Sequence, residues 1–120
     1  MATILVINAK AGLVFATQTA LQSANYETLI ASSVRDAIDT LGNIRPTLIL
    51  LGDTEASMRA SMAILKAHPQ TRDIPVILQS DQLMIQNPDY QQSLGATAVL
   101  ENPYSARQLI DDIATWIQPA

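Results

Sequence analysis

Five short runs of β-branched and aliphatic residues are separated by longer segments of mixed character. The runs cover residues 3–7, 27–31, 47–51, 76–79 and 98–100. The first, third and fourth runs are apolar almost throughout, which is typical of strands buried on both faces of a parallel sheet. The second and fifth runs are more mixed, as strands at the edges of a sheet are. The pattern therefore predicts five strands, three of them central.

The segments between these runs carry apolar residues at helical spacing, so that one face of each segment is apolar. The apolar stripes are Val14, Thr17, Leu21 and Ala24; Val34, Ala37, Ile38 and Leu41; Met58, Met62 and Leu65; and Leu109, Ile110, Ile113, Trp116 and Ile117. Because Trp116 shares the last stripe, we predict that it is buried against the sheet.

Signals for helix ends support these segments. Ser33 and Asp36 have the spacing of a weak capping box, and Gly42 is positioned to end the helix that follows. Asn87-Pro88 and Gly95 bracket a further helix before the last strand, since proline suits the first helical position and glycine the end. Strands and helices therefore alternate along the whole chain.

This alternation predicts the fold class. Five β/α units cannot close an eight-stranded barrel, and parallel strands need right-handed crossovers between them. The remaining solution is an α/β, three-layer (αβα), doubly wound parallel sheet of five strands in the order 2-1-3-4-5, of the flavodoxin-like type. A chain of 120 residues suits one such domain, spanning 1–120. Any site is expected at the carboxyl ends of strands 1 and 3.

Composition removes several classes of function. The net charge is −4 and the seven basic residues are scattered singly, so the nucleic-acid footprint of clustered basic residues is missing. The absence of cysteine excludes disulfides, thiolate catalysis and cysteine-ligated zinc. The apolar runs are too short to span a bilayer, and we expect a cytoplasmic protein without a membrane anchor.

Signatures of catalysis are also missing from the sequence. A phosphate-binding glycine-rich loop does not follow the first strand, where Asn8-Ala9-Lys10-Ala11-Gly12 stands instead. The only histidine, His68, has no acidic or cysteine partner at triad or ligand spacing, and its place at the end of a helix suggests a structural role. We therefore expect no enzymatic activity, no catalytic residues, no bound metal and no cofactor.

Four sequence segments resemble one protein family. They are ILVI at 4–7, PTLILL at 46–51, HPQTRDIPVI at 68–77 and GATAVLENPY at 95–104. In this combination the chain resembles a response-regulator receiver domain, the phosphoacceptor module of bacterial two-component and phosphorelay signalling. The resemblance extends over about residues 3–117. It implies the receiver variant of the flavodoxin-like fold and a role as a signalling protein.

The resemblance also implies where the chemistry of such a domain should stand. Receiver domains carry two adjacent acids after strand 1 and a phosphoacceptor aspartate at the end of strand 3, which together hold Mg²⁺. A serine or threonine after strand 4 and a lysine after strand 5 contact the phosphoryl group. Here the acidic pair is replaced by Asn8 and Ala9, the phosphoacceptor by Gly52 and the lysine by Asn102; only Ser80 matches. The chain is thus predicted to be a degenerate pseudo-receiver.

Asp53 is the one carboxylate beside this degenerate pocket. It stands one residue beyond the phosphoacceptor position, and a shift of one residue in a strand turns a side chain to the opposite face. We interpret Asp53 as a cap of the following helix. A weakly phosphorylatable receiver that uses Asp53 remains an alternative.

The leading hypothesis is an atypical, phosphorylation-independent receiver-like domain that acts through protein–protein contact. The resemblance implies an interaction surface on the fourth helix, the last strand and the last helix, at about 87–117. Its candidate residues are Tyr90, Val99, Tyr104, Gln108 and Asp112. The expected partners are a histidine kinase, an output domain or another regulator, or a second copy of the chain through the same face.

A second hypothesis is a small-ligand sensor. Helix N-termini converge at the crevice between strands 1 and 3, which suits an anion. Asn8, Ser80 and Asn102 would give this crevice a neutral polar lining. The sequence leaves this alternative open.

Overall fold

Nine helices and strands are placed in the computed structural model, which describes residues 2–52, 55–80, 89, 95, 98–101 and 106–117. In chain order they are β1 (Thr3–Ile7), α1 (Ala11–Ser23), β2 (Glu27–Ala31), α2 (Val34–Leu41), β3 (Leu48–Gly52), α3 (Glu55–Ala67), β4 (Val76–Ser80), β5 (Ala98–Glu101) and α5 (Ala106–Trp116). The predicted strand positions agree with these bounds to within one residue. The further helix predicted between β4 and β5 lies largely outside the described residues.

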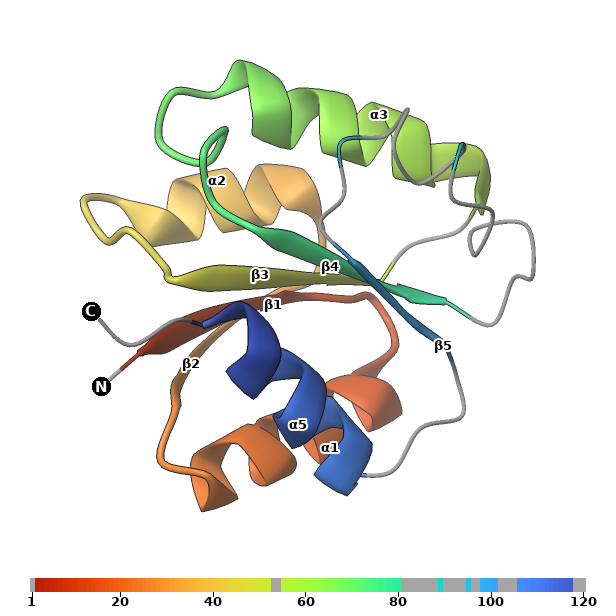
Figure 1. Ribbon diagram of the computed structural model, residues 1–120. Helices are drawn as coiled ribbons and strands as arrows, with labels where there is room; N and C mark the ends of the chain where they lie inside the picture. The colour runs from red at the N-terminus through yellow and green to blue at the C-terminus, as the bar shows by residue number, and fades with distance from the viewer. Residues whose placement is uncertain are drawn as a thin grey trace.

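The strands form one parallel sheet in the order β2-β1-β3-β4-β5. Helices α1 and α5 cover one face and α2 and α3 cover the other, as Figure 1 shows. The expected doubly wound αβα architecture with an open parallel sheet is therefore confirmed for the described residues. None of the helices in that part of the chain has both the length and the apolar character needed to cross a membrane.

The core lies on both faces of the central strands, because their side chains alternate between two apolar clusters. On β1, Ile4 and Val6 pack towards Leu21 of α1 and Leu109 of α5. The intervening residue Leu5 packs towards the cluster of α2 and α3. Because both faces of these strands are buried, polar and apolar residues do not alternate along them. This explains the uniformly apolar runs in the sequence.

Local signals set the ends of α2. The Ser33 side chain accepts a hydrogen bond from the Asp36 amide at 3.1 Å, so the predicted N-cap is present. The helix ends before Gly42, whose φ of +53° lies in the region that glycine adopts most easily. The turn residue Gly95 also has a positive φ, of +79°.

The predicted burial of Trp116 is wrong. Leu109 and Ile113 of the same helix are buried, but Trp116 is 41% exposed. It is the last residue of α5, so its large ring reaches the end of the region that the helix covers. Helical periodicity placed Trp116 on the correct stripe but could not show where the stripe leaves the core.

Candidate functional site

The strand register brings the carboxyl ends of the central strands together. Ile7 at the end of β1 pairs with Leu51, the neighbour of Gly52 in β3. Gly52 in turn pairs with Gln79, the residue before Ser80 in β4. The edge formed by the carboxyl ends of β1, β3 and β4 is therefore where the degenerate pocket was expected. We call it the carboxyl edge below.

At this edge, Asn8 occupies the space beside Gly52. A Cβ atom at position 52 would overlap Nδ2 of Asn8 and would lie 3.0 Å from its Cγ. The approach to Nδ2 is closer than real Cβ atoms show, so any larger residue at position 52 requires the Asn8 side chain to shift. The position that the resemblance assigns to the phosphoacceptor is thus a glycine whose side-chain space is filled by a neighbouring amide.

Two hydrogen bonds hold Asn8 in this position. Its backbone amide donates to the carbonyl of Ala31 at 3.0 Å and extends the pairing of β1 with β2. Its side-chain Oδ1 accepts from the backbone amide of Lys10 at 2.9 Å, which is the local turn that asparagine favours. Because only the amide oxygen can accept from an N–H group, the nitrogen is the atom left facing Gly52.

The donor atoms of the described residues at this edge do not fit Mg²⁺, the ion that the receiver fold implies. Mg²⁺ requires oxygen ligands, usually carboxylates. The Asn8 oxygen is engaged by Lys10, and neither Ala9 nor Gly52 has a side-chain donor. Among the described residues, a cluster of three or more histidine or acidic side chains that could hold a metal is not found.

The other residues of the degenerate pocket are described only in part. The backbone of Ser80 ends β4 and pairs with Glu101. Asp53 and Asn102 lie outside the described residues. Phosphotransfer to Asp53 and a ligand lining that includes Asn102 therefore stay predictions.

One polar residue at this edge was missed by the sequence analysis. Gln79 is 3% exposed and stands opposite Gly52 in the register. Ile77, two residues earlier in β4, belongs to the α1 and α5 cluster, so alternation places Gln79 on the same side of the sheet. A polar residue at the end of an otherwise apolar run was the signal that could have found it.

The expected interaction surface is also described in part. Tyr90 and Tyr104 lie outside the described residues, and Val99 is placed only by its backbone pairing with Leu78. On α5, Gln108 is exposed and Asp112 is half-buried. These two residues are four apart and share one stripe of the helix.

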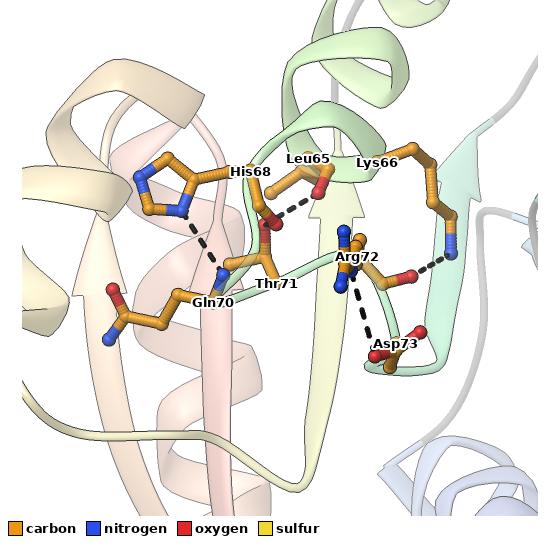
Figure 2. A network of polar contacts seen from close by, with 7 residues as sticks. All are labelled: Leu65, Lys66, His68, Gln70, Thr71, Arg72 and Asp73. Atoms are coloured by element: carbon orange, nitrogen blue, oxygen red, sulfur yellow. Dashed lines mark hydrogen bonds and ion pairs between the residues drawn. The ribbon is translucent and has the colours of Figure 1, made fainter.

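A second polar region lies at the turn between α3 and β4, in one of the segments that resemble receiver domains (Figure 2). Thr71 is fully buried, and its hydroxyl donates to the carbonyl of Leu65 at 2.6 Å. Nδ1 of His68 accepts from the backbone amide of Gln70 at 3.3 Å. His68 therefore has a structural contact in this turn.

The same turn is tied to its surroundings. The Gln70 side chain donates to the carbonyls of Gly42 and Ile44, at 2.8 and 2.9 Å. Nζ of Lys66 donates to the carbonyl of Arg72 at 3.4 Å. The turn thus links α3 to the connection between α2 and β3, on the side of the sheet that α2 and α3 cover.

Comparisons with known proteins agree with this architecture. No family model matches the sequence, and no curated protein shows significant similarity to it. Among solved structures, the chemotaxis response regulator CheY4 of Vibrio cholerae aligns with a TM-score of 0.84 at 19% identity, covering 97% of this chain and 98% of that one. The signal receiver domain of a histidine kinase from Syntrophus aciditrophicus aligns with a TM-score of 0.82 at 23% identity, covering 98% and 90%.

A third solved structure carries a metal. The receiver domain of a sensor histidine kinase from Pseudomonas aeruginosa, with a magnesium ion in its active-site cleft, aligns with a TM-score of 0.81 at 17% identity, covering 97% of each chain. Together these likenesses show that the chain has the fold of response-regulator receiver domains. In the described part of the carboxyl edge, Asn8, Ala9 and Gly52 stand at the positions where the resemblance implies acidic residues.

Proposed function

We propose that the chain is a phosphorylation-independent receiver-like domain of two-component or phosphorelay signalling that acts in the cytoplasm through protein–protein contact. The observation that carries this proposal is the Asn8 side chain lying beside Gly52 at the carboxyl edge. The position that should hold the nucleophile has no side chain, and an amide nitrogen fills the space. The domain is accordingly a binding module without an enzymatic step.

Phosphoryl transfer depends on positioning and on charge stabilisation, for which Mg²⁺ and its carboxylate ligands are essential parts. Among the described residues, the group nearest to position 52 is the neutral Asn8 amide, and the residue paired with Gly52 in the strand register is the buried Gln79. Neither is a nucleophile or a carboxylate. The fold therefore offers its surface to partners, while the chemistry that would switch that surface is missing from the described part of the edge.

The face formed by α5, β5 and the segment before β5 is the proposed contact surface for a histidine kinase, an output domain or another regulator. Gln108 and Asp112 give α5 an accessible polar stripe on this side. Trp116 follows Asp112 by one further turn and is 41% exposed. An exposed tryptophan beside polar residues is a frequent anchor of protein interfaces.

A phosphodonor experiment tests the proposal. The full chain is incubated with acetyl phosphate and Mg²⁺, and intact-mass spectrometry records whether a phosphoryl group is added. We expect no stoichiometric adduct on the natural sequence. A matched variant that carries Asn8→Asp, Ala9→Asp, Gly52→Asp and Asn102→Lys restores the implied groups and serves as the positive control.

A stoichiometric acyl phosphate on the natural sequence would contradict the proposal. Loss of that adduct in Asp53→Asn would identify the carboxylate and establish the alternative of a weakly phosphorylatable receiver. The small-ligand alternative is not favoured by any contact among the described residues, since Asn8 takes up room beside Gly52.

A further inference from the structure

Helix α1 lacks the charged outer face that surface helices normally carry. Its thirteen residues, Ala11–Ser23, include no charged side chain, whereas α2, α3 and α5 each include three. Phe15, the only phenylalanine of the chain, is 71% exposed on α1. A surface helix without charge and with an exposed aromatic ring is typical of an interface.

A groove of about 610 Å³ runs between α1 and α5. The α1 wall includes the small residues Ala16 and Ala20 together with Phe15, and the α5 wall includes Ile110. The two helices lie side by side on one face of the sheet in Figure 1 and are in contact. The groove therefore places a protruding ring next to a shallow apolar depression.

The hydroxyl groups that line this groove donate within α1. The Thr19 hydroxyl donates to the carbonyl of Phe15, and the Ser23 hydroxyl donates to the carbonyl of Thr19, both at 2.9 Å. Hydroxyl groups that already donate to a carbonyl of the preceding helical turn do not need water or a polar ligand as a partner. The α1 wall thus presents mainly methyl and aliphatic groups, which suits an apolar protein surface better than a polar small molecule.

We propose that this groove binds a second copy of the chain and makes a two-fold symmetric dimer. In a two-fold interface the same patch faces itself, so it must contain both a protrusion and the depression that receives it. Phe15 is the protrusion, and the groove beside Ala16 and Ala20 receives the ring of the other copy. The inference rests on the proposed function, because it names the partner of one surface of an interaction module.

Charge also favours a second copy. The polar residues of the α5 wall, Arg107 and Asp111, have opposite signs and are four residues apart. When two α5 helices cross about a two-fold axis between these positions, Arg107 of each copy faces Asp111 of the other. The chain carries a net charge of −4, but the charges that line this groove sum to zero, so like-charge repulsion between two copies is small there.

The groove is separate from the contact surface proposed for signalling partners. Gln108 and Asp112 lie about 100° around α5 from Arg107 and Asp111, because each residue advances by about that angle along a helix. A dimer through α1 and α5 therefore uses a different stripe of α5 from the signalling face.

Sedimentation equilibrium of the full chain over a series of concentrations tests this inference. We expect a concentration-dependent dimer. Phe15→Gln should raise its dissociation constant by about tenfold or more, since aromatic anchors dominate interface energies. Ile64→Gln is the matched control, because Ile64 is also an exposed apolar residue (36%) but lies on α3, across the sheet, and should leave the constant unchanged. Thermal unfolding of each variant confirms that it is folded.

Charge reversal sharpens the test. Arg107→Asp and Asp111→Arg should each weaken the dimer, and the double variant should restore it, because only the double variant recreates opposite charges across the axis. A chain that is monomeric at every concentration, or a dimer equally weakened by Ile64→Gln or unaffected by Phe15→Gln, would overturn the inference. These outcomes are independent of the phosphodonor experiment, so the two proposals can fail separately.

Discussion

The carboxyl edge and the turn between α3 and β4 are both segments where the chain resembles receiver domains, yet they differ in what they contain. At the carboxyl edge the reactive positions are occupied by a glycine and a neutral amide, Gly52 and Asn8. In the turn, the polar groups of Thr71 and Gln70 make specific hydrogen bonds to backbone carbonyls. In this chain the turn therefore has polar residues that hold the fold together, whereas the edge lacks the acidic residues that would carry its chemistry.

The difference also shows how the space beside a glycine can be filled without a side chain of its own. An unfilled space at a packed position normally costs stability. Here the Asn8 side chain lies where a side chain at position 52 would begin, and its Oδ1 accepts a hydrogen bond from the Lys10 amide. Four predictions test this comparison.

Adding one carbon at the carboxyl edge should have the largest effect. Gly52→Ala places a Cβ against the Asn8 amide, which must turn away from Lys10 to make room, and should lower the free energy of unfolding by about 1–3 kcal/mol. Urea denaturation measures the change. Gly12→Ala is the matched control. Gly12 lies in α1 with open space around it, so this variant should raise the free energy of unfolding by about 0.5–1 kcal/mol.

A double-mutant cycle with Asn8→Ala separates the Asn8 contact from other causes. If the loss in Gly52→Ala comes from overlap with Asn8, the double variant loses less stability than the two single variants added together. Strict additivity would show that another neighbour resists the added carbon.

Removing the buried hydroxyl of the turn should have the next largest effect. Thr71→Val keeps the shape of the side chain but leaves the Leu65 carbonyl without its 2.6 Å hydrogen bond, at a cost of about 1–2 kcal/mol. Thr71→Ser keeps the hydroxyl and loses one methyl group, so it should cost about 0.8 kcal/mol. A larger loss in the serine variant than in the valine variant would show that packing, rather than the hydrogen bond, fixes this turn.

The link from the turn to the neighbouring loop should matter less. Gln70→Ala removes two hydrogen bonds to the carbonyls of Gly42 and Ile44, which water can partly replace, and should cost about 0.5–1 kcal/mol. Gln22→Ala, on an exposed position of α1, is the control and should stay within about 0.5 kcal/mol. Equal losses of stability in the two variants would show that the two Gln70 hydrogen bonds do not stabilise the fold.

The ion pair of the turn should contribute least. Nε of Arg72 and the Asp73 carboxylate are 3.9 Å apart, and both side chains are well exposed, at 59% and 70%. Exposed pairs of this kind are screened by water, so the coupling energy from a cycle of Arg72→Ala and Asp73→Ala should stay below about 0.5 kcal/mol. A coupling above 1 kcal/mol, about the upper end measured for exposed pairs, would place the pair among the elements that hold the turn.

The sequence was sufficient to predict the alternation of strands and helices, because strands buried on both faces must be apolar at every position. Residues 3–7 and 27–31 became strands with the predicted bounds, and residues 47–51 shifted by one, to Leu48–Gly52. The N-cap at Ser33 was also predictable, since it depends on residues three positions apart. Signals of this kind are local or periodic.

Relations between distant segments could not be predicted in the same way. The positions of Asn8 and Gly52 at one edge followed from the fold, but the turn of the Asn8 amide over Gly52 depends on its bond to Lys10 and on the β1–β3 spacing. The exposure of Trp116 and the groove beside Phe15 depend on where helices stop and how closely they pack. The periodicity of apolar residues shows neither the contacts between distant residues nor the place where a helix leaves the core.

The contact between Asn8 and Gly52 has a consequence for protein engineering. An aspartate placed at position 52 by a single substitution would bring its Cβ against the Asn8 amide. The Asn8 side chain would then have to turn away and give up its hydrogen bond to the Lys10 amide. A carboxylate is therefore best introduced at position 52 together with a smaller or acidic residue at position 8.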